Sequence, residues 1–290
     1  MTSMETSNKR KRIYTENNLL QSGIILFFGS LLGSIILSYF NESGFSSRIT
    51  RFNDFTLIHF IAAFTIAPVL EELIFRGIFT GKKIFKYVMY LGSLLYIILL
   101  QNYYLIPILA IFIVAFELNR SKNIPYHIYY INAVLFGLFN DLKLLDTWIG
   151  IVMTSGMGLI LIWMVLNFGL IYSILLHALN NFVAVAIVVL GNETSDMTLK
   201  KVETQDFTMK YQRVSFFIKD ENMQVEVNKF LKAENMSISN IHNALCFDEK
   251  LDDLYFGKFN VSIERKSNST KKLDCESFHQ LLNKTDLEEN

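Results

Sequence analysis

Two adjacent carboxylates and an arginine lie inside an apolar stretch of the chain. Glu71 and Glu72 are followed by Arg76, and the residues around them are mostly hydrophobic. On a helix, Glu72 and Arg76 face the same side and can neutralise each other, which leaves Glu71 turned toward another part of the protein. An acid without a cationic partner in an apolar setting suits general-base chemistry. The alternative is a buried ion pair with a spare acid that only holds helices in register.

Three further polar residues end or interrupt apolar runs. His177 and Asn181 have the spacing of one helical face, and both side chains can donate hydrogen bonds to a carbonyl oxygen that develops negative charge. The alternative is a histidine and an asparagine that only bridge two helices. Asn140 ends the run from Ala133, where it could also serve as a helix cap.

The elements that carry these residues are apolar enough to cross a lipid bilayer. Hydrophobic residues make up 51% of the chain, and about 20 apolar residues of helix span the ~30 Å hydrocarbon layer. A charge inside such a span costs several kcal/mol unless it has a partner, so these residues indicate function. We predict seven spans, although the short third, fourth and fifth runs leave six or eight open. The spans are Leu19–Phe40, Phe55–Phe79, Tyr87–Leu100, Tyr103–Phe116, Ile128–Asn140, Trp148–Leu166 and Leu170–Leu190.

Basic residues predict the orientation of the chain. Residues 9–12 are all Lys or Arg, so residues 1–18 are expected to form a basic cytoplasmic segment before a first span that is retained as an anchor. With seven spans, the polar tail would lie outside the cytoplasm, and with eight it would lie inside. Both cysteines, Cys246 and Cys275, are in this tail. A disulfide and two free thiols therefore both remain open.

The tail carries the pattern of a small soluble domain. Val214–Ile218 and Phe259–Ile263 are typical of strands, and two groups of apolar residues are typical of helical faces, namely Ile238, Ile241 and Leu245, then Phe278, Leu281 and Leu282. We see no phosphate loop, zinc-ligand cluster or nucleophile motif here. The predicted fold is an all-α polytopic membrane bundle of about seven transmembrane helices (19–190) with a small C-terminal α+β soluble domain (191–290).

Taken in order, three motifs on successive hydrophobic runs resemble a known family. They are Glu71-Glu72-x-x-x-Arg76, Phe136-x-x-x-Asn140 and His177-x-x-x-Asn181, and they are similar to the motifs of the CAAX protease and bacteriocin-processing family of intramembrane endopeptidases. The resemblance covers approximately residues 55–190. It implies hydrolysis of a peptide bond in a cavity open to membrane and water. Glu71 would activate the water, Glu72 and Arg76 would support the site, and His177 with Asn181 would hold the oxyanion.

One position departs from the family pattern. The second motif of the family ends in histidine, and here that position is Asn140, which cannot take up a proton at neutral pH. General-base assistance worth about 10² to 10⁴ in rate is therefore at risk. The neighbouring Asp141 could substitute, whereas His127 and His59 are expected about 20 Å along their helices, which is too far.

The expected partners follow from this resemblance. We expect no cofactor and no metal at the acids, because no His-Glu-x-x-His motif occurs and only His177 is at the right depth. The partners would be the lipid bilayer, a peptide or membrane-protein substrate and an unknown partner of the tail, not nucleic acid, in the cytoplasmic membrane of a bacterium. Two other functions remain: a catalytically degenerate scaffold or regulator, and a small transporter, which no repeat supports.

Overall fold

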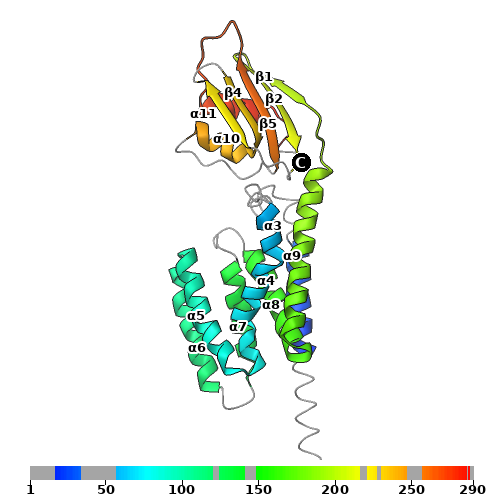
Figure 1. The fold of residues 1–290 in the computed structure, drawn as a ribbon, viewed down its shortest axis with the longest axis vertical. Helices are drawn as coiled ribbons and strands as arrows, with labels where there is room; N and C mark the ends of the chain where they lie inside the picture. Colours follow the sequence, from blue (N-terminus) through cyan, green and yellow to red (C-terminus); the bar gives the residue numbers. More distant parts are fainter. Residues whose placement is uncertain are drawn as a thin grey trace, which may run out of the picture. The chain divides into compact units, whose positions relative to one another are not determined.

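The computed structural model describes residues 17–33, 57–119, 124–140, 148–215, 221–226, 230–246, 257–285 and 287. The chain divides into two compact units, one formed by Met1–Gly44 and Ile61–Phe182 and the other by Phe45–Phe60 and Val183–Asn290. In the described residues, the first unit is helical, and the second combines a sheet and two short helices with the ends of two helices that it shares with the first unit (Figure 1).

Helices account for the described parts of all seven predicted spans. Residues 17–33 are helical, and the remainder of the first predicted span lies outside the described residues. The other elements are α3 (Leu57–Phe64), α4 (Ile66–Phe75), η2 (Gly77–Thr80), α5 (Lys83–Leu100), η3 (Tyr103–Leu105), α6 (Ile106–Asn119), α7 (Tyr126–Asn140), α8 (Trp148–Phe168) and α9 (Leu170–Glu193). Among the described helices, α8 and α9 are long and apolar enough to cross a bilayer by themselves. The count of seven spans stays a prediction.

Apolar side chains cover the outside of the helical unit. On α5, Leu91, Leu95 and Leu99 follow one another at helical spacing and are 67%, 57% and 69% exposed. On α9, Leu175 and Leu179 are exposed in the same way. Water would solvate such faces poorly, whereas lipid tails solvate them well. This surface agrees with an integral membrane protein.

The predicted second span is broken into shorter helices. α3 ends at Phe64 and α4 begins at Ile66, so the chain turns at Thr65. Pro68 lies in the first turn of α4 and has no N–H to donate to the carbonyl group four residues earlier. The hydroxyl of Thr65 donates to the carbonyl oxygen of Ile61 at 2.7 Å. The break therefore separates α3 from the helix that carries both acids.

Glycines allow close packing around α8. A Cβ atom at Gly137 of α7 would lie 2.7 Å from the carbonyl oxygen of Ile151, and one at Gly156 would lie 2.6 Å from the backbone nitrogen of Phe27. Only glycine permits such approach, as is usual between helices in membranes. α7 and the helix formed by residues 17–33 are thus both held tightly against α8.

The second unit is built on a five-stranded antiparallel sheet. The strands are β1 (Lys200–Glu203), β2 (Phe207–Val214), β3 (Asn222–Glu226), β4 (Phe230–Met236) and β5 (Lys258–Arg265), in the order β1-β2-β5-β4-β3. α10 (Ile238–Leu245) packs on β4, and α11 (Cys275–Leu282) packs on β2 (Figure 1). The predicted α+β class of the tail agrees with this arrangement.

Alternation along the central strands creates the core of this unit. Phe207, Met209 and Tyr211 of β2 are buried, and their polar neighbours in the strand are less so. Val261 and Ile263 of β5 continue the same face. Because one face of the sheet is apolar, two helices suffice to cover it.

One of the two predicted strands of the tail is confirmed, since Phe259–Ile263 lies within β5. Of the other, Val214–Ile218, the first residue ends β2 and Ser215 is not in a strand, while residues 216–218 lie outside the described part of the chain. The strand observed here is Phe207–Val214, in which apolar and polar residues alternate.

The two cysteines form a disulfide. Cys246 follows α10 and Cys275 begins α11, with their Cα atoms 5.1 Å apart. The expectation that the tail holds no cluster of metal-ligand residues is wrong, because His242 and His279 lie next to this pair. The cluster is hard to predict from the sequence, because each helix contributes one histidine and one cysteine rather than two histidines or two cysteines.

Candidate active site

Three helices of the first unit carry the candidate residues. α4 carries Glu71 and Glu72, and Arg76 caps its C-terminal end. α9 carries His177 and Asn181. α7 ends at Asn140. All six residues belong to one compact unit, so their distances can be compared directly.

Glu72 is the most strongly held member of the site. Its Oε1 atom lies 3.0 Å from Nδ1 of His177 and 3.2 Å from Nη1 of Arg76. Its Oε2 atom accepts a hydrogen bond of 2.5 Å from the hydroxyl of Ser173. The carboxylate is fully buried. Both of its oxygens are engaged, so Glu72 is suited to positioning its neighbours rather than to taking up a proton.

His177 lies between the two acids. A carboxylate only accepts hydrogen bonds, so Nδ1 of His177 carries the proton that is donated to Glu72. This leaves Nε2 facing Oε2 of Glu71 at 3.7 Å. That distance is longer than a direct hydrogen bond, and it is short enough for one water molecule or substrate oxygen beside the pair to contact both atoms.

Glu71 keeps its carboxylate available. Its side chain is 13% exposed, and within the described residues its Oε2 atom has no hydrogen-bond partner. Its spacing predicted that Glu71 would point away from Glu72. The structure instead directs both acids at one imidazole ring, which each approaches through a different nitrogen. The reason is that His177 of α9 lies close to two successive residues of α4.

Arg76 is buried beneath the acids. Its guanidinium group lies over the ring of Phe136 at 3.6 Å from the ring centroid, in addition to its ion pair with Glu72. The same ring meets His177 edge to face, with centroids 5.7 Å apart. Phe136 therefore holds the cation and the imidazole in place from one side.

The two asparagines of the predicted site are placed differently. Asn140 donates to the carbonyl oxygen of Phe136 on its own helix at 3.0 Å, and its side chain also interacts with Glu71. Asn181 donates to the carbonyl oxygen of Ala63 at 2.9 Å, one helical turn beyond His177. Asn140 thus adjoins Glu71, whereas the amide of Asn181 is engaged with α3.

Three contacts of this site were not predicted from the sequence. Ser173 binds Glu72, Phe136 stacks on Arg76, and Asn132 donates to the carbonyl oxygen of Phe75 at 3.0 Å, close to the end of α4. Ser173 could have been found, since it precedes His177 by four residues and extends the polar stripe of α9. Phe136 is the first residue of the second motif, but the motif does not indicate that its ring contacts Arg76.

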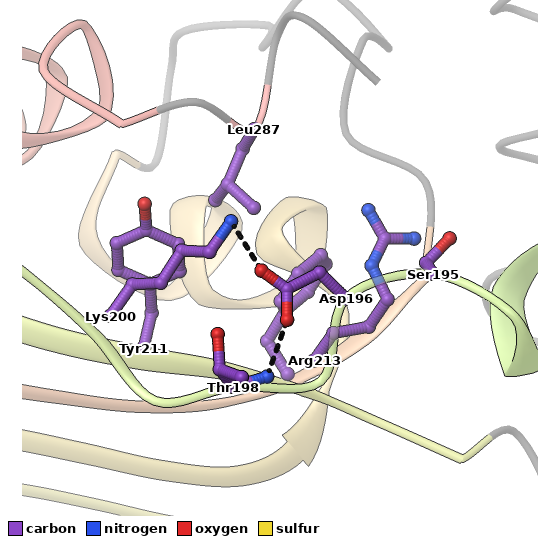
Figure 2. A pocket seen from close by; sticks show the side chains of 8 residues that line it. Ser195, Asp196, Thr198, Lys200, Tyr211, Arg213 and Leu287 are labelled. Carbon is purple, nitrogen blue, oxygen red and sulfur yellow. Dashed lines mark hydrogen bonds and ion pairs between the residues drawn. The ribbon is translucent and has the colours of Figure 1, made fainter.

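A separate pocket lies in the second unit beside β1 and β2. Figure 2 shows the Asp196 carboxylate bound to the backbone N–H of Thr198 at 2.9 Å and to Nζ of Lys200 at 3.0 Å. These two partners, the Thr198 N–H first, lower the pKa of Asp196 to about 2. Arg213 also lines this pocket and interacts with Asn192. Asp196 and Lys200 pair with each other and Arg213 interacts with Asn192, so we assign no ligand to this pocket.

Comparison with known proteins adds one match. Residues 53–183 match a family model described as type II CAAX prenyl endopeptidase Rce1-like. No curated protein and no solved structure matches the chain. The matched range contains Glu71, Glu72, Arg76, Asn140, His177 and Asn181.

Proposed function

We propose that the chain is an intramembrane endopeptidase in which Glu71 activates a water molecule, because residues 53–183 match the family model of type II CAAX prenyl endopeptidases. The family consists of integral membrane hydrolases. The proposal for this chain is that the same chemistry takes place between α4 and α9.

The observation that supports this most is the position of His177 between two unlike carboxylates. Glu72 holds the ring through Nδ1, and Nε2 lies 3.7 Å from Oε2 of Glu71, so one water molecule beside the two atoms could contact both. Glu71 would take the proton of this water molecule as it attacks a peptide carbonyl. The protonated form of His177 would donate from Nε2 to the resulting oxyanion.

The charges in the site fit this scheme. Glu71, Glu72 and Arg76 together carry a net charge of −1, and a protonated His177 makes the group neutral. Transfer of the water proton to Glu71 compensates for the negative charge that forms on the substrate. The buried site can therefore host the tetrahedral intermediate without an unpaired charge.

We propose no metal in this mechanism. A zinc ion at Glu71 and His177 would need a third ligand, and the nearest candidate is Glu72. Both oxygens of Glu72 are already bound, by Arg76 and His177 at one and by Ser173 at the other. Metal binding would have to break these contacts.

The substrate we propose is a peptide segment at the membrane surface, of the prenylated C-terminal class that the family description names. The exposed apolar faces on α5 and α9 favour a lipid environment for the unit, and a lipid-linked peptide would be concentrated there. We also propose that the unit crosses the cytoplasmic membrane of a bacterium several times.

The test compares cleavage of a fluorogenic prenylated peptide by the full chain in nanodiscs with cleavage by Glu71→Gln. The substitution preserves size and removes the proton acceptor, so we expect kcat to fall by about 10² to 10⁴. Glu117→Gln is the matched control, since Glu117 pairs with Lys86 and Tyr90 on the outside of the unit. Unchanged cleavage by Glu71→Gln would overturn the mechanism.

A second candidate is a catalytically degenerate scaffold that binds such peptides without cleaving them. Asn140 supports it, because this residue stands where the family motif has histidine and its amide is engaged with Phe136. Asn140→His separates the two functions. A gain of cleavage from none in the natural chain would identify a degenerate enzyme, whereas similar activity in both would identify a working asparagine variant.

A further inference from the structure

Two helices of the second unit bring four metal-binding side chains to one point. His242 and Cys246 are spaced four residues apart on α10 and its C-cap, and Cys275 and His279 have the same spacing on α11. Each pair therefore lies on one face of its helix. The two helices pack against each other, and the four potential ligand atoms lie within 4.8 Å of one another.

The two imidazole rings bring two possible ligand nitrogens together. The Nε2 atoms of His242 and His279 lie 3.2 Å apart and form a hydrogen bond in this structure. In a tetrahedral zinc site with Zn–N bonds of about 2.0–2.1 Å, two nitrogens are separated by roughly 3.3 Å. The separation of the nitrogens thus matches that of two zinc ligands, and metal binding would replace the hydrogen bond by a turn of the rings toward a common ion.

The two sulfur atoms are closer together than two thiolate ligands of zinc would be, because a disulfide joins them. Cys246 and Cys275 form a disulfide, and their Cα atoms are 5.1 Å apart. Thiolates about 2.3 Å from a tetrahedral zinc ion would lie roughly 3.8 Å apart. Reduction followed by a small separation of the two sulfurs would complete four ligands around a common centre.

We propose that the reduced form of this cluster is a structural zinc site formed by His242, Cys246, Cys275 and His279, and that the disulfide is its oxidised, metal-free form. Two thiolates and two imidazoles are a donor set that selects Zn²⁺ in tetrahedral geometry. His242 is fully buried and Cys246 is 4% exposed. Cys275 and His279 are partly buried, and four protein ligands leave no open coordination site, so the role is structural.

The conversion balances with a dithiol as the reductant. The dithiol supplies two electrons and two protons to the Cys246–Cys275 bond and becomes a disulfide itself, which leaves two cysteine thiols. Zn²⁺ then displaces both thiol protons as the two Zn–S bonds form. Exchange of the two thiolates with a disulfide oxidant reverses the sequence: the oxidant takes the two electrons and, with two protons from water, becomes a dithiol, and the ion is released.

Both forms would join α10 to α11. These helices cover one face of the sheet, and the ring of Phe278 on α11 packs 6.4 Å from that of His242. A disulfide makes the link in an oxidising compartment and zinc makes it in a reducing one. The unit would therefore keep its helix pair on either side of the membrane.

The experiment uses the full chain in detergent, purified either oxidised or reduced with a water-soluble phosphine under nitrogen. Each form is dialysed against Zn²⁺, and bound metal is counted by atomic emission. We expect one Zn²⁺ per chain at this site in the reduced form and none in the oxidised form. With Co²⁺ in place of Zn²⁺, thiolate-to-cobalt charge-transfer bands should appear only after reduction, which distinguishes this site from a metal at the acids of the first unit.

Substitutions of the histidines test the ligand set. His242→Gln and His279→Gln leave the disulfide intact, so the fold of each variant can be verified in the oxidised form before reduction. Each should weaken zinc binding by more than the roughly 10–100-fold that loss of an outer hydrogen-bond partner causes. His127→Gln, at an exposed position of α7, is the control and should bind zinc as the natural chain does. Absence of zinc from the reduced chain, or unchanged affinity in both histidine variants, would overturn the proposal.

Discussion

Glu71 and Glu72 are neighbours in the chain, yet their surroundings are opposite. Glu72 is contacted by a guanidinium, an imidazole and a hydroxyl, whereas the Oε2 atom of Glu71 has no hydrogen-bond partner among the described residues. Two carboxylates in such different environments are commonly assigned different roles. Here the difference supports the proposal that Glu72 positions its neighbours and that Glu71 takes part in the chemistry.

Ser173→Ala tests the positioning role of Glu72. The change removes the hydroxyl that donates to Oε2, and a hydrogen bond to a charged group contributes about 1.5–3 kcal/mol. We expect kcat for peptide cleavage to fall by about 10- to 100-fold with KM unchanged, because Ser173 is fully buried and would act through Glu72. Steady-state kinetics of the full chain in nanodiscs measures both quantities.

Ser173→Thr is the matched control, since it keeps the hydroxyl. Its activity should stay near that of the natural chain. If alanine and threonine had the same effect on kcat, the hydroxyl would have no part in holding Glu72.

The sequence predicted some of these contacts and not others, for a physical reason. The spacing of Glu72 and Arg76 on one helix is sufficient to predict their ion pair, because the geometry is local. The contact between Ser173 and Glu72 joins residues 101 positions apart, so it depends on how α9 packs against α4. A serine in an apolar helix more often binds a carbonyl of its own helix, which is why the sequence did not single it out.

Among the helices, α8 has the role of a central support. It packs closely on α7, which carries Phe136 and Asn140, and on the helix formed by residues 17–33. Glycine at the crossing points lets these backbones approach. The position of the motif on α7 therefore depends on residues that have no chemistry of their own.

Gly137→Ala tests this dependence. The added methyl group would meet Ser155 and the carbonyl oxygen of Ile151, and overpacking of this kind costs about 1–3 kcal/mol. We expect a lower unfolding temperature, measured by tryptophan fluorescence, since Trp148 and Trp163 both lie in α8. At Gly29 an added methyl group meets nothing within 4 Å, so Gly29→Ala should not lower that temperature. Equal effects at the two positions would contradict the packing argument.

β1 of the second unit is supported by an ion pair that responds to acid. The pKa of Asp196 is about 2 in the folded chain, below the ordinary value of 3.8, so its contribution to stability is present above pH 3.8 and is lost as the pH falls through 2. We expect Asp196→Asn to lower the protection factors of amides in Lys200–Glu203 at pH 6. This difference from the natural chain should disappear near pH 2.

Hydrogen exchange with mass spectrometry measures this effect, because protection factors correct for the pH dependence of intrinsic exchange. Asp196 is exposed, so the change should be small and confined to β1. A difference between the variant and the natural chain that stayed constant from pH 6 to pH 2 would be inconsistent with titration of this carboxylate.

Tertiary packing determines those features of the helices and strands that the sequence does not predict. Long apolar runs are sufficient to predict helices such as α8 and α9. The break at Thr65 depends instead on the missing N–H of Pro68 and on the hydrogen bond from Thr65 to Ile61. In the tail, the apolar run that begins at Val214 predicted a strand there, whereas the described strand is the segment that ends at Val214. Alternation along Phe207–Val214 was the better signal, because only one face of the sheet is covered by helices.

At the scale of the whole molecule, a membrane-embedded unit with protease motifs is joined to an α+β unit with a candidate zinc site. The fall in hydropathy after Gly191 predicted two parts, although α9 continues to Glu193 and its residues are divided between the units. Sequence reasoning could not predict the His242 and His279 cluster, because it forms only when α10 and α11 pack together. Its oxidation state in cells would indicate the compartment in which the tail lies.

The most direct test of the account is a double-substitution cycle of Glu71→Gln and His177→Gln, measured as single-turnover cleavage of a prenylated peptide by the full chain. If the two residues act on the same water molecule and carbonyl, each single change should reduce the rate by about 10² to 10⁴ and the double change should cause no greater loss than the worse single change. If instead the two losses multiply, the residues act independently and the shared site between α4 and α9 is contradicted.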